Sequence, residues 1–97
     1  MENILTKIKT AIKKLFPNIP SRDLLQILSK KAFQEWLKQI PSEKVDNFLS
    51  SYVTKIVKAH IRHNYTDYDD KLYMGERRNN ARLSVNSKIE IIMESWR

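Results

Sequence analysis

Apolar residues recur at steps of three and four along most of the chain, which is the spacing of one face of an α-helix. The first such stretch predicts a helix over about residues 2–16, which ends at Pro17 and Pro20 because proline cannot continue a helix. The second predicts a helix over about residues 22–39, with Ser21 as its N-cap. Three further stretches predict helices over about residues 43–62, 67–74 and 77–95.

The predicted helix over residues 43–62 has the most regular apolar stripe, and we expect it to be the central element. Gly75, the only glycine, is expected to end the short fourth helix with a positive φ. Sheets are not expected, because no segment alternates apolar and polar residues and one glycine leaves few positions for hairpin turns. The sequence therefore predicts one compact all-α domain, residues 1–97, of about five helices, with Trp36 and Trp96 as large apolar anchors.

Composition narrows the classes of function. The 97 residues include no cysteine, which excludes disulfides, thiolate metal sites and cysteine nucleophiles. No apolar run approaches the roughly 20 residues of a membrane span, so we expect no membrane partner and a cytoplasmic location. The motifs of phosphate-binding loops, zinc proteases, EF-hands and nucleophile elbows are missing. We expect no cofactor, no metal and no catalytic residues, and an enzyme is the less favoured interpretation.

The segment from Arg62 to Asp70 holds the densest group of reactive side chains. In a structural interpretation, Thr66 and Asp69 form a capping box for the next helix, and Arg62 pairs with a carboxylate across the turn. In a functional interpretation, His63 is a general base or an anion contact, and the candidate site comprises Arg62, His63, Thr66, Tyr68 and Asp69. A third interpretation is a metal site of His60 and His63 with Asp67 or Asp69. In each case His63 and Asp69 are expected on the same side of the turn.

Positive charge is the other distinctive feature. Lysine and arginine number 18 against 11 acidic residues, and the net charge of +7 favours polyanionic partners. Lys55, Lys58 and Arg62 follow one another at helical spacing and form a stripe that could track a phosphate backbone. Such a stripe is also an ordinary solvated face.

The last predicted helix opens with residues that read nucleic-acid bases in other proteins. A short helix, a turn with Gly75 and a second helix have the outline of a helix-turn-helix. Arginine and asparagine make bidentate contacts with guanine and adenine edges. The three aspartates of the preceding short helix oppose this interpretation, because they would repel phosphates. The candidate residues are Arg77, Arg78, Asn79 and Arg82, together with Lys55 and Lys58 of the basic stripe.

A family resemblance rests on a signature in the second half of the chain. The residues that carry it are Arg62, His63, Thr66, Tyr68, Asp69, Gly75, Arg78, Ala81, Arg82 and Trp96. They resemble the pattern of a bacterial domain-of-unknown-function family, DUF2293, over about residues 17–97, with Pro17 and Pro20 as its lead-in. Arg77 stands where the family tends to have an acidic residue. The resemblance implies a compact, mostly helical domain and no particular reaction.

Three hypotheses about function remain from the sequence. The leading one is a non-enzymatic binding module with nucleic acid as its partner. The second is a protein-protein interaction domain. The third is a small enzyme or anion-binding site at the motif from Arg62 to Asp69.

Overall fold

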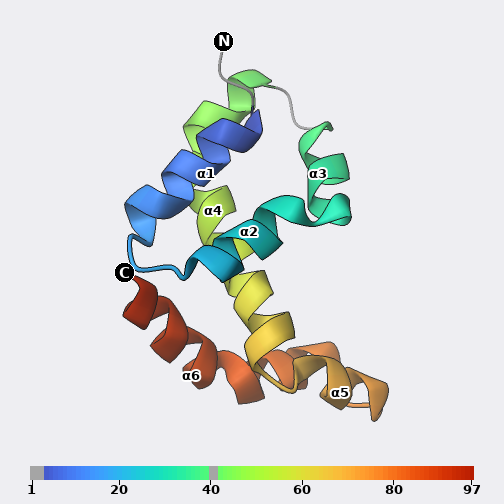
Figure 1. Ribbon diagram of the computed structural model, residues 1–97. Coiled ribbons are helices and arrows are strands. Elements are labelled where there is room, and N and C mark those ends of the chain that lie inside the picture. Colours follow the sequence, from blue (N-terminus) through green and yellow to red (C-terminus); the bar gives the residue numbers. More distant parts are fainter. Residues whose placement is uncertain (1–3, 40–41) are drawn as a thin grey trace.

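The computed structural model describes residues 4–39 and 42–97, which form six helices and no strand. The helices are α1 (Ile4–Leu15), α2 (Ser21–Ser29), α3 (Lys31–Leu37), α4 (Ser42–Tyr65), α5 (Tyr68–Tyr73) and α6 (Arg78–Trp96) (Figure 1). The prediction of an all-α domain is confirmed. None of the described helices is both long and apolar enough to cross a membrane.

The number of helices differs from the expected five because the predicted helix over residues 22–39 is broken at Lys30. Lys30 has extended backbone angles (φ −65°, ψ 120°), and the Gln34 side chain donates a hydrogen bond of 2.8 Å to the Leu28 carbonyl oxygen beside the break. Phe33 is nine residues after Leu24 in the sequence, so on a straight helix it would lie about 180° around the axis. One straight helix could not bury both side chains against the same core.

The start of α2 also differs from the prediction. Ser21 is the first residue of α2, and Pro20 takes the N-cap position with φ −61° and ψ 140°. No side-chain hydrogen bond caps the helix there, so the expected role of Ser21 as N-cap is wrong. Proline already has the φ angle that this position needs, and the helix begins one residue earlier than it would with a serine cap at residue 21.

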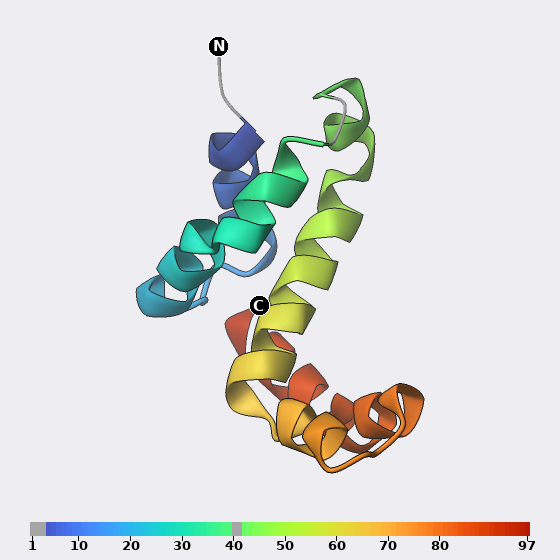
Figure 2. The ribbon, with the colours of Figure 1, turned by 90° about the vertical axis from the view of Figure 1, so that its right-hand side faces the viewer.

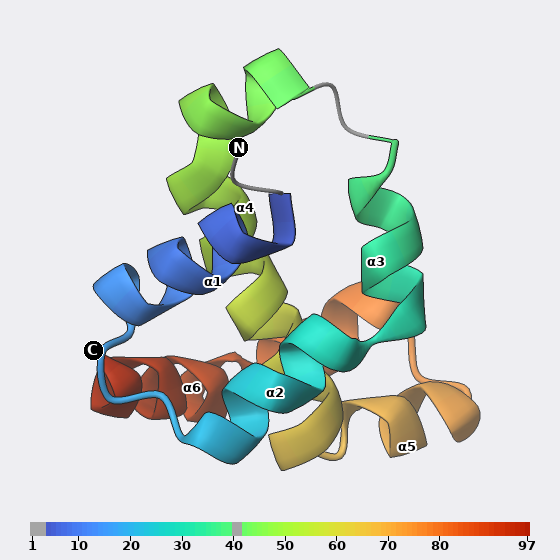
Figure 3. The ribbon, with the colours of Figure 1, turned by 45° about the horizontal axis from the view of Figure 1, so that its top comes forward.

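Helix α4 is the central helix of the fold, as predicted. It runs past α1 and α2 in its first part and past α5 and α6 in its last part (Figure 2), and it packs against all four of them. With the top of the molecule tilted forward, α1 and α3 lie on opposite sides of the molecule, and α6 passes beside the C-terminal part of α4 (Figure 3). This arrangement brings the C-terminal end of α4 together with α5 and the start of α6.

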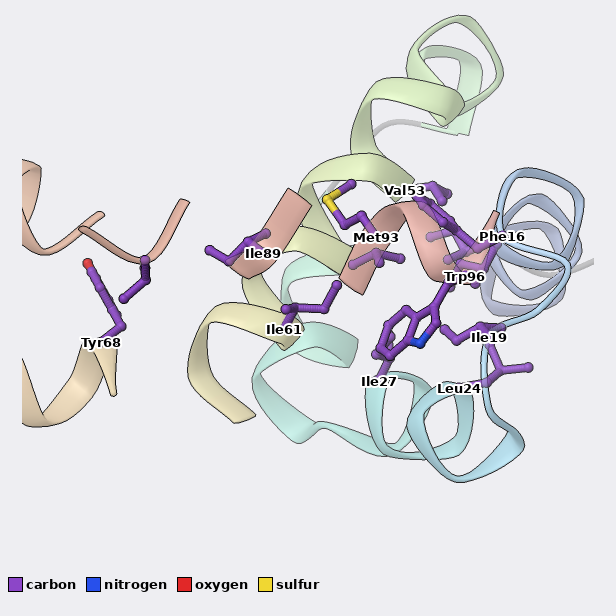
Figure 4. Close-up of a cluster of buried hydrophobic side chains, with 14 of the residues drawn as sticks. Phe16, Ile19, Leu24, Ile27, Val53, Ile61, Tyr68, Ile89, Met93 and Trp96 are labelled. Carbon is purple, nitrogen blue, oxygen red and sulfur yellow. The ribbon is translucent and has the colours of Figure 1, made fainter. Parts of the chain in front are cut away.

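The core joins the two ends of the chain. Trp96 is buried and points into the same cluster as Phe16, Ile19 and Ile27 (Figure 4). The Asn18 backbone N–H donates a hydrogen bond of 2.9 Å to the Trp96 carbonyl oxygen, which fastens the end of α6 to the connector after α1. Trp96 is therefore the core anchor that the sequence predicted. The side chain of Trp36, the other predicted anchor, lies outside the described part of the structure.

The turn between α5 and α6 is a Schellman motif centred on Gly75. Gly75 has φ +92°, its N–H bonds the Leu72 carbonyl oxygen at 3.0 Å, and the Glu76 N–H bonds the Lys71 carbonyl oxygen at 3.0 Å. These two hydrogen bonds satisfy carbonyl oxygens at the end of α5 that have no partner within the helix. The prediction of a positive φ at Gly75 is confirmed.

Candidate functional site

The turn from α4 to α5 brings the predicted motif together. His63 Nδ1 and Asp69 Oδ1 lie 2.8 Å apart, which confirms that these two side chains share one side of the turn. The Thr66 hydroxyl donates to the Arg62 carbonyl oxygen and accepts a hydrogen bond of 3.2 Å from the Tyr68 N–H. The expected capping box is present only in part, because Asp69 bonds His63 and Asp67 occupies the N-cap position of α5.

Tyr68 is the centre of this turn. Its side chain is 3% exposed, the His63 ring meets it edge-on at 5.6 Å, and the Arg62 guanidinium lies over the ring at 5.4 Å from its centroid. A cation over an aromatic face is attracted by the quadrupole of the ring. The motif therefore has internal contacts that position its side chains before any ligand binds.

Arg62 is the member of the motif whose hydrogen-bonding capacity is not used. The expected clamp between Arg62 and a carboxylate is absent from the described residues, and its Nε is buried with no hydrogen-bond partner there. Burial lowers the pKa of the Arg62 guanidinium from its ordinary value, the positive charge of Arg82 lowers it further, and Tyr68 partly offsets both. Two guanidinium groups thus repel each other across the interface between α4 and α6.

We call Arg62, Arg77, Arg78 and Arg82 the arginine corner. Arg78 and Arg82 are one turn apart on α6, and Arg77 is the N-cap residue of that helix. No member of the corner forms an ion pair with any residue in the described ranges. Several cations elsewhere are matched, as in Lys58 with Glu90 at 3.6 Å, Lys71 with Asp67 and Glu76, and Arg97 with Glu94 at 2.9 Å. Lys9, Lys13 and Lys14 of α1 likewise form no ion pair with the described residues.

The other residues predicted to contact nucleic acid differ in whether they form an ion pair. Asn79 is exposed in the first turn of α6 next to the arginine corner. Lys55 is exposed on α4, whereas Lys58 pairs with Glu90 of α6. The predicted basic stripe along α4 is therefore interrupted at its middle residue, Lys58.

A buried polar cluster between α2 and α4 was missed by the sequence analysis. Asp23 is 3% exposed and accepts a hydrogen bond of 2.9 Å from His60 Nε2, and the Tyr65 hydroxyl donates to its two oxygens at 2.7 and 2.9 Å. Asn64 donates to His60 Nδ1 at 3.2 Å, so Nε2 carries the proton that bonds the carboxylate. The hydrogen bond to Asp23 is the largest cause that raises the pKa of Tyr65, followed by burial and the carboxylate charge, and Arg22 opposes the shift.

This cluster separates the two histidines of the proposed metal site. His60 bonds Asp23 in the interior, and His63 bonds Asp69 at the surface. Within residues 4–39 and 42–97, no group of three histidine and carboxylate side chains is arranged to hold a metal ion. The metal interpretation therefore gains no support from the geometry.

Three surface hollows lie outside the contacts of His63 with Asp69 and Tyr68. One of about 140 Å³ is lined by Ile27, Phe33 and His60 among others, and one of about 190 Å³ lies beside Asp23 and Tyr65. The third, of about 280 Å³, lies between α1 and α2. None of these three hollows is lined by a residue of the motif from Arg62 to Asp69 except Asn64 and Tyr65, so they offer His63 no concave substrate site.

Comparison with known proteins gives one match. The sequence model of a family described as "Uncharacterized conserved protein (DUF2293)" matches residues 11–97. The match begins before the expected residue 17 and includes the arginine corner, the α4–α5 turn and Trp96. No curated protein and no solved structure matches the chain.

Proposed function

The chain belongs to the DUF2293 family of uncharacterized conserved proteins, and we propose that it is a non-enzymatic module that binds the phosphate backbone of a nucleic acid at the arginine corner. The observation that carries this proposal is the accumulation of unpaired guanidinium groups where α4, α5 and α6 meet. Arginine presents a planar fork of donors that matches the oxygens of a phosphate. The net charge of +7 adds a long-range attraction for polyanions.

Electrostatic repulsion between guanidinium groups of the arginine corner favours the binding of an anionic ligand. Arg62 and Arg82 are close enough for each positive charge to disfavour the other, and the Nε of Arg62 has lost water without gaining an acceptor in the described part of the chain. Both features cost folding free energy. A phosphate between the two guanidinium groups would remove the repulsion and could accept hydrogen bonds from their terminal nitrogens, although not from the buried Nε of Arg62.

The test is a binding titration with charge-neutral variants. We expect a fluorescein-labelled oligonucleotide to bind with an affinity that falls as salt rises, because each neutralised phosphate contributes about −0.7 to the log-log slope for a single strand and about −0.9 for B-DNA. Arg62→Gln and Arg82→Gln should each weaken binding and reduce the magnitude of the slope by about one contact. The Arg82 side chain is exposed, so this variant keeps the test valid if Arg62→Gln lowers stability.

Arg97→Gln is the matched control. It removes the same charge from the other end of α6, roughly 22 Å from Arg82 at 1.5 Å per residue. Arg97 is already paired with Glu94, so its loss should change the affinity little. No binding to either single-stranded or duplex oligonucleotides at about 50 mM salt would refute the proposed function. An equal loss in Arg97→Gln would refute the assignment to the arginine corner.

A second candidate function is protein binding at the hollow between α1 and α2. Lys9 and Lys13, one turn apart on α1, flank an apolar floor that includes Leu24 and Leu25, and Leu25 is 66% exposed. A leucine-bearing acidic helix of a partner protein would match both the floor and the charged rim. If oligonucleotides do not bind, this hollow becomes the favoured site.

A further inference from the structure

Tyr73 and Met74 are the most exposed of the large apolar side chains beside the arginine corner. Tyr73 is 91% exposed and Met74 is 82% exposed, at the end of α5. Tyr68, at the other end of the same short helix, is 3% exposed. The Tyr73 ring makes no ring contact and no hydrogen bond with the described residues, so both of its faces are open to a ligand.

The turn after Tyr73 fixes the backbone position of this residue relative to the arginines. The two Schellman hydrogen bonds at Gly75 and Glu76 set the path of the chain from α5 to α6. Lys71 supports the same turn through ion pairs with Asp67 at 4.0 Å and Glu76 at 3.9 Å. Tyr73 therefore lies at a hydrogen-bonded turn, a few residues before Arg77 and Arg78 in the sequence.

An exposed aromatic ring beside arginines without ion pairs is typical of surfaces that bind single-stranded nucleic acids. Bases stack on exposed aromatic rings while cationic side chains hold the backbone, and every base has a face that can stack. The bases of a duplex are already stacked on one another, so an exposed ring on the outside of a duplex has no base to meet. We propose that the ligand of the arginine corner is a single-stranded nucleic acid, one base of which stacks on Tyr73. This inference rests on the proposed function.

The acidic residues of α5 oppose a duplex. Asp67, Asp69 and Asp70 are exposed on or beside this six-residue helix, and the Asp70 carboxylate has no partner in the described part of the chain. A helix docked in the roughly 12 Å major groove has phosphates on both sides, at a density of about one charge per 1.7 Å of axis. A duplex would bring these carboxylates against phosphates, whereas a single strand has one row of phosphates and can follow the arginine side of the turn.

The experiment compares matched single-stranded and duplex probes of about fifteen nucleotides, within the site size of small single-strand binders. We expect the single strand to bind more tightly in fluorescence anisotropy. Tyr73→Ala should weaken single-strand binding by about five- to a hundredfold, whereas Tyr73→Phe should keep most of it because the ring remains. Ile91→Ala, which shortens an exposed apolar side chain in the second half of α6, away from the arginine corner, is the control and should change nothing.

The outcomes separate this inference from the proposed function. If neither probe binds, both fail. If duplex binds as tightly as single strand and Arg82→Gln weakens it while Tyr73→Ala does not, nucleic-acid binding stands and the single-strand inference is overturned. An equal loss of both probes in Tyr73→Ala also overturns it, because a stacked base is available only in the single strand. Melting curves of the variants should coincide with the wild type, because Tyr73 contributes almost nothing to the core.

Discussion

Replacing Asp23 by alanine should destabilise the fold far more than the loss of an exposed carboxylate. Asp23→Ala leaves His60 Nε2 buried without its acceptor, and an unsatisfied buried polar group costs about 1–3 kcal/mol. The Tyr65 hydroxyl also loses both hydrogen bonds to the carboxylate, but Tyr65 is 38% exposed and water can replace them. The expected loss in the free energy of unfolding is therefore about 2–4 kcal/mol.

Urea unfolding followed by circular dichroism measures this loss directly. In a domain of this size, each kcal/mol lowers Tm by about 4–8 °C, so Asp23→Ala should also lower the Tm of thermal unfolding, by roughly 8–32 °C. Glu94→Ala is the matched control, because the Glu94 carboxylate also lies 2.9 Å from the nitrogen of its partner, Arg97, but that pair is exposed. An exposed pair contributes about 0–1 kcal/mol.

A double-mutant cycle separates the hydrogen bond from the other effects of the mutation. Combining Asp23→Ala with His60→Ala should cost less than the sum of the two single losses, because each single variant already leaves the other partner unsatisfied. The reasoning is wrong if Asp23→Ala costs no more than Glu94→Ala. A coupling free energy below about 0.5 kcal/mol would likewise show that the buried contact between α2 and α4 is energetically unimportant.

Two further predictions concern Gly75 and Tyr65. Gly75→Ala should lower the free energy of unfolding in urea by about 1 kcal/mol, because φ +92° disfavours a Cβ although no atom lies within 4 Å of its position. Gly75→Asn should cost less, because asparagine tolerates the left-handed conformation better. Equal stability of the wild type and the two variants would contradict this prediction. The pKa of Tyr65 is raised above its ordinary value of about 10, so its contribution to stability is complete below that pH and is lost as pH rises through the raised pKa. The stability advantage of the wild type over Tyr65→Phe should therefore stay constant up to about pH 10 and shrink above it. An advantage that stays constant above that pH would show that the hydrogen bond to Asp23 does not act on this pKa.

The helices and their local ends could be predicted because the signals are local. Periodicity indicates which face of a helix is apolar, and a single glycine after Met74 predicts the left-handed residue that ends α5. The break at Lys30 was also present in the sequence as a change of phase, since Leu24 and Phe33 lie on opposite faces of any straight helix. The apolar residues cover a broad face of the predicted helix over residues 22–39, so the change of phase was not recognised. The His63 and Asp69 contact was predictable because six residues and one turn separate the partners.

The tertiary structure alone decided which distant side chains meet. Asp23 is separated by 37 residues from His60 and by 42 from Tyr65, and no local pattern relates them. Nor does spacing predict that the charge of Arg82 lowers the pKa of Arg62, or that Tyr68 is buried while Tyr73 of the same helix is exposed. Periodicity determines only that a helix has an apolar face. Where that face points, and which charges are brought together by it, depends on how the helices cross.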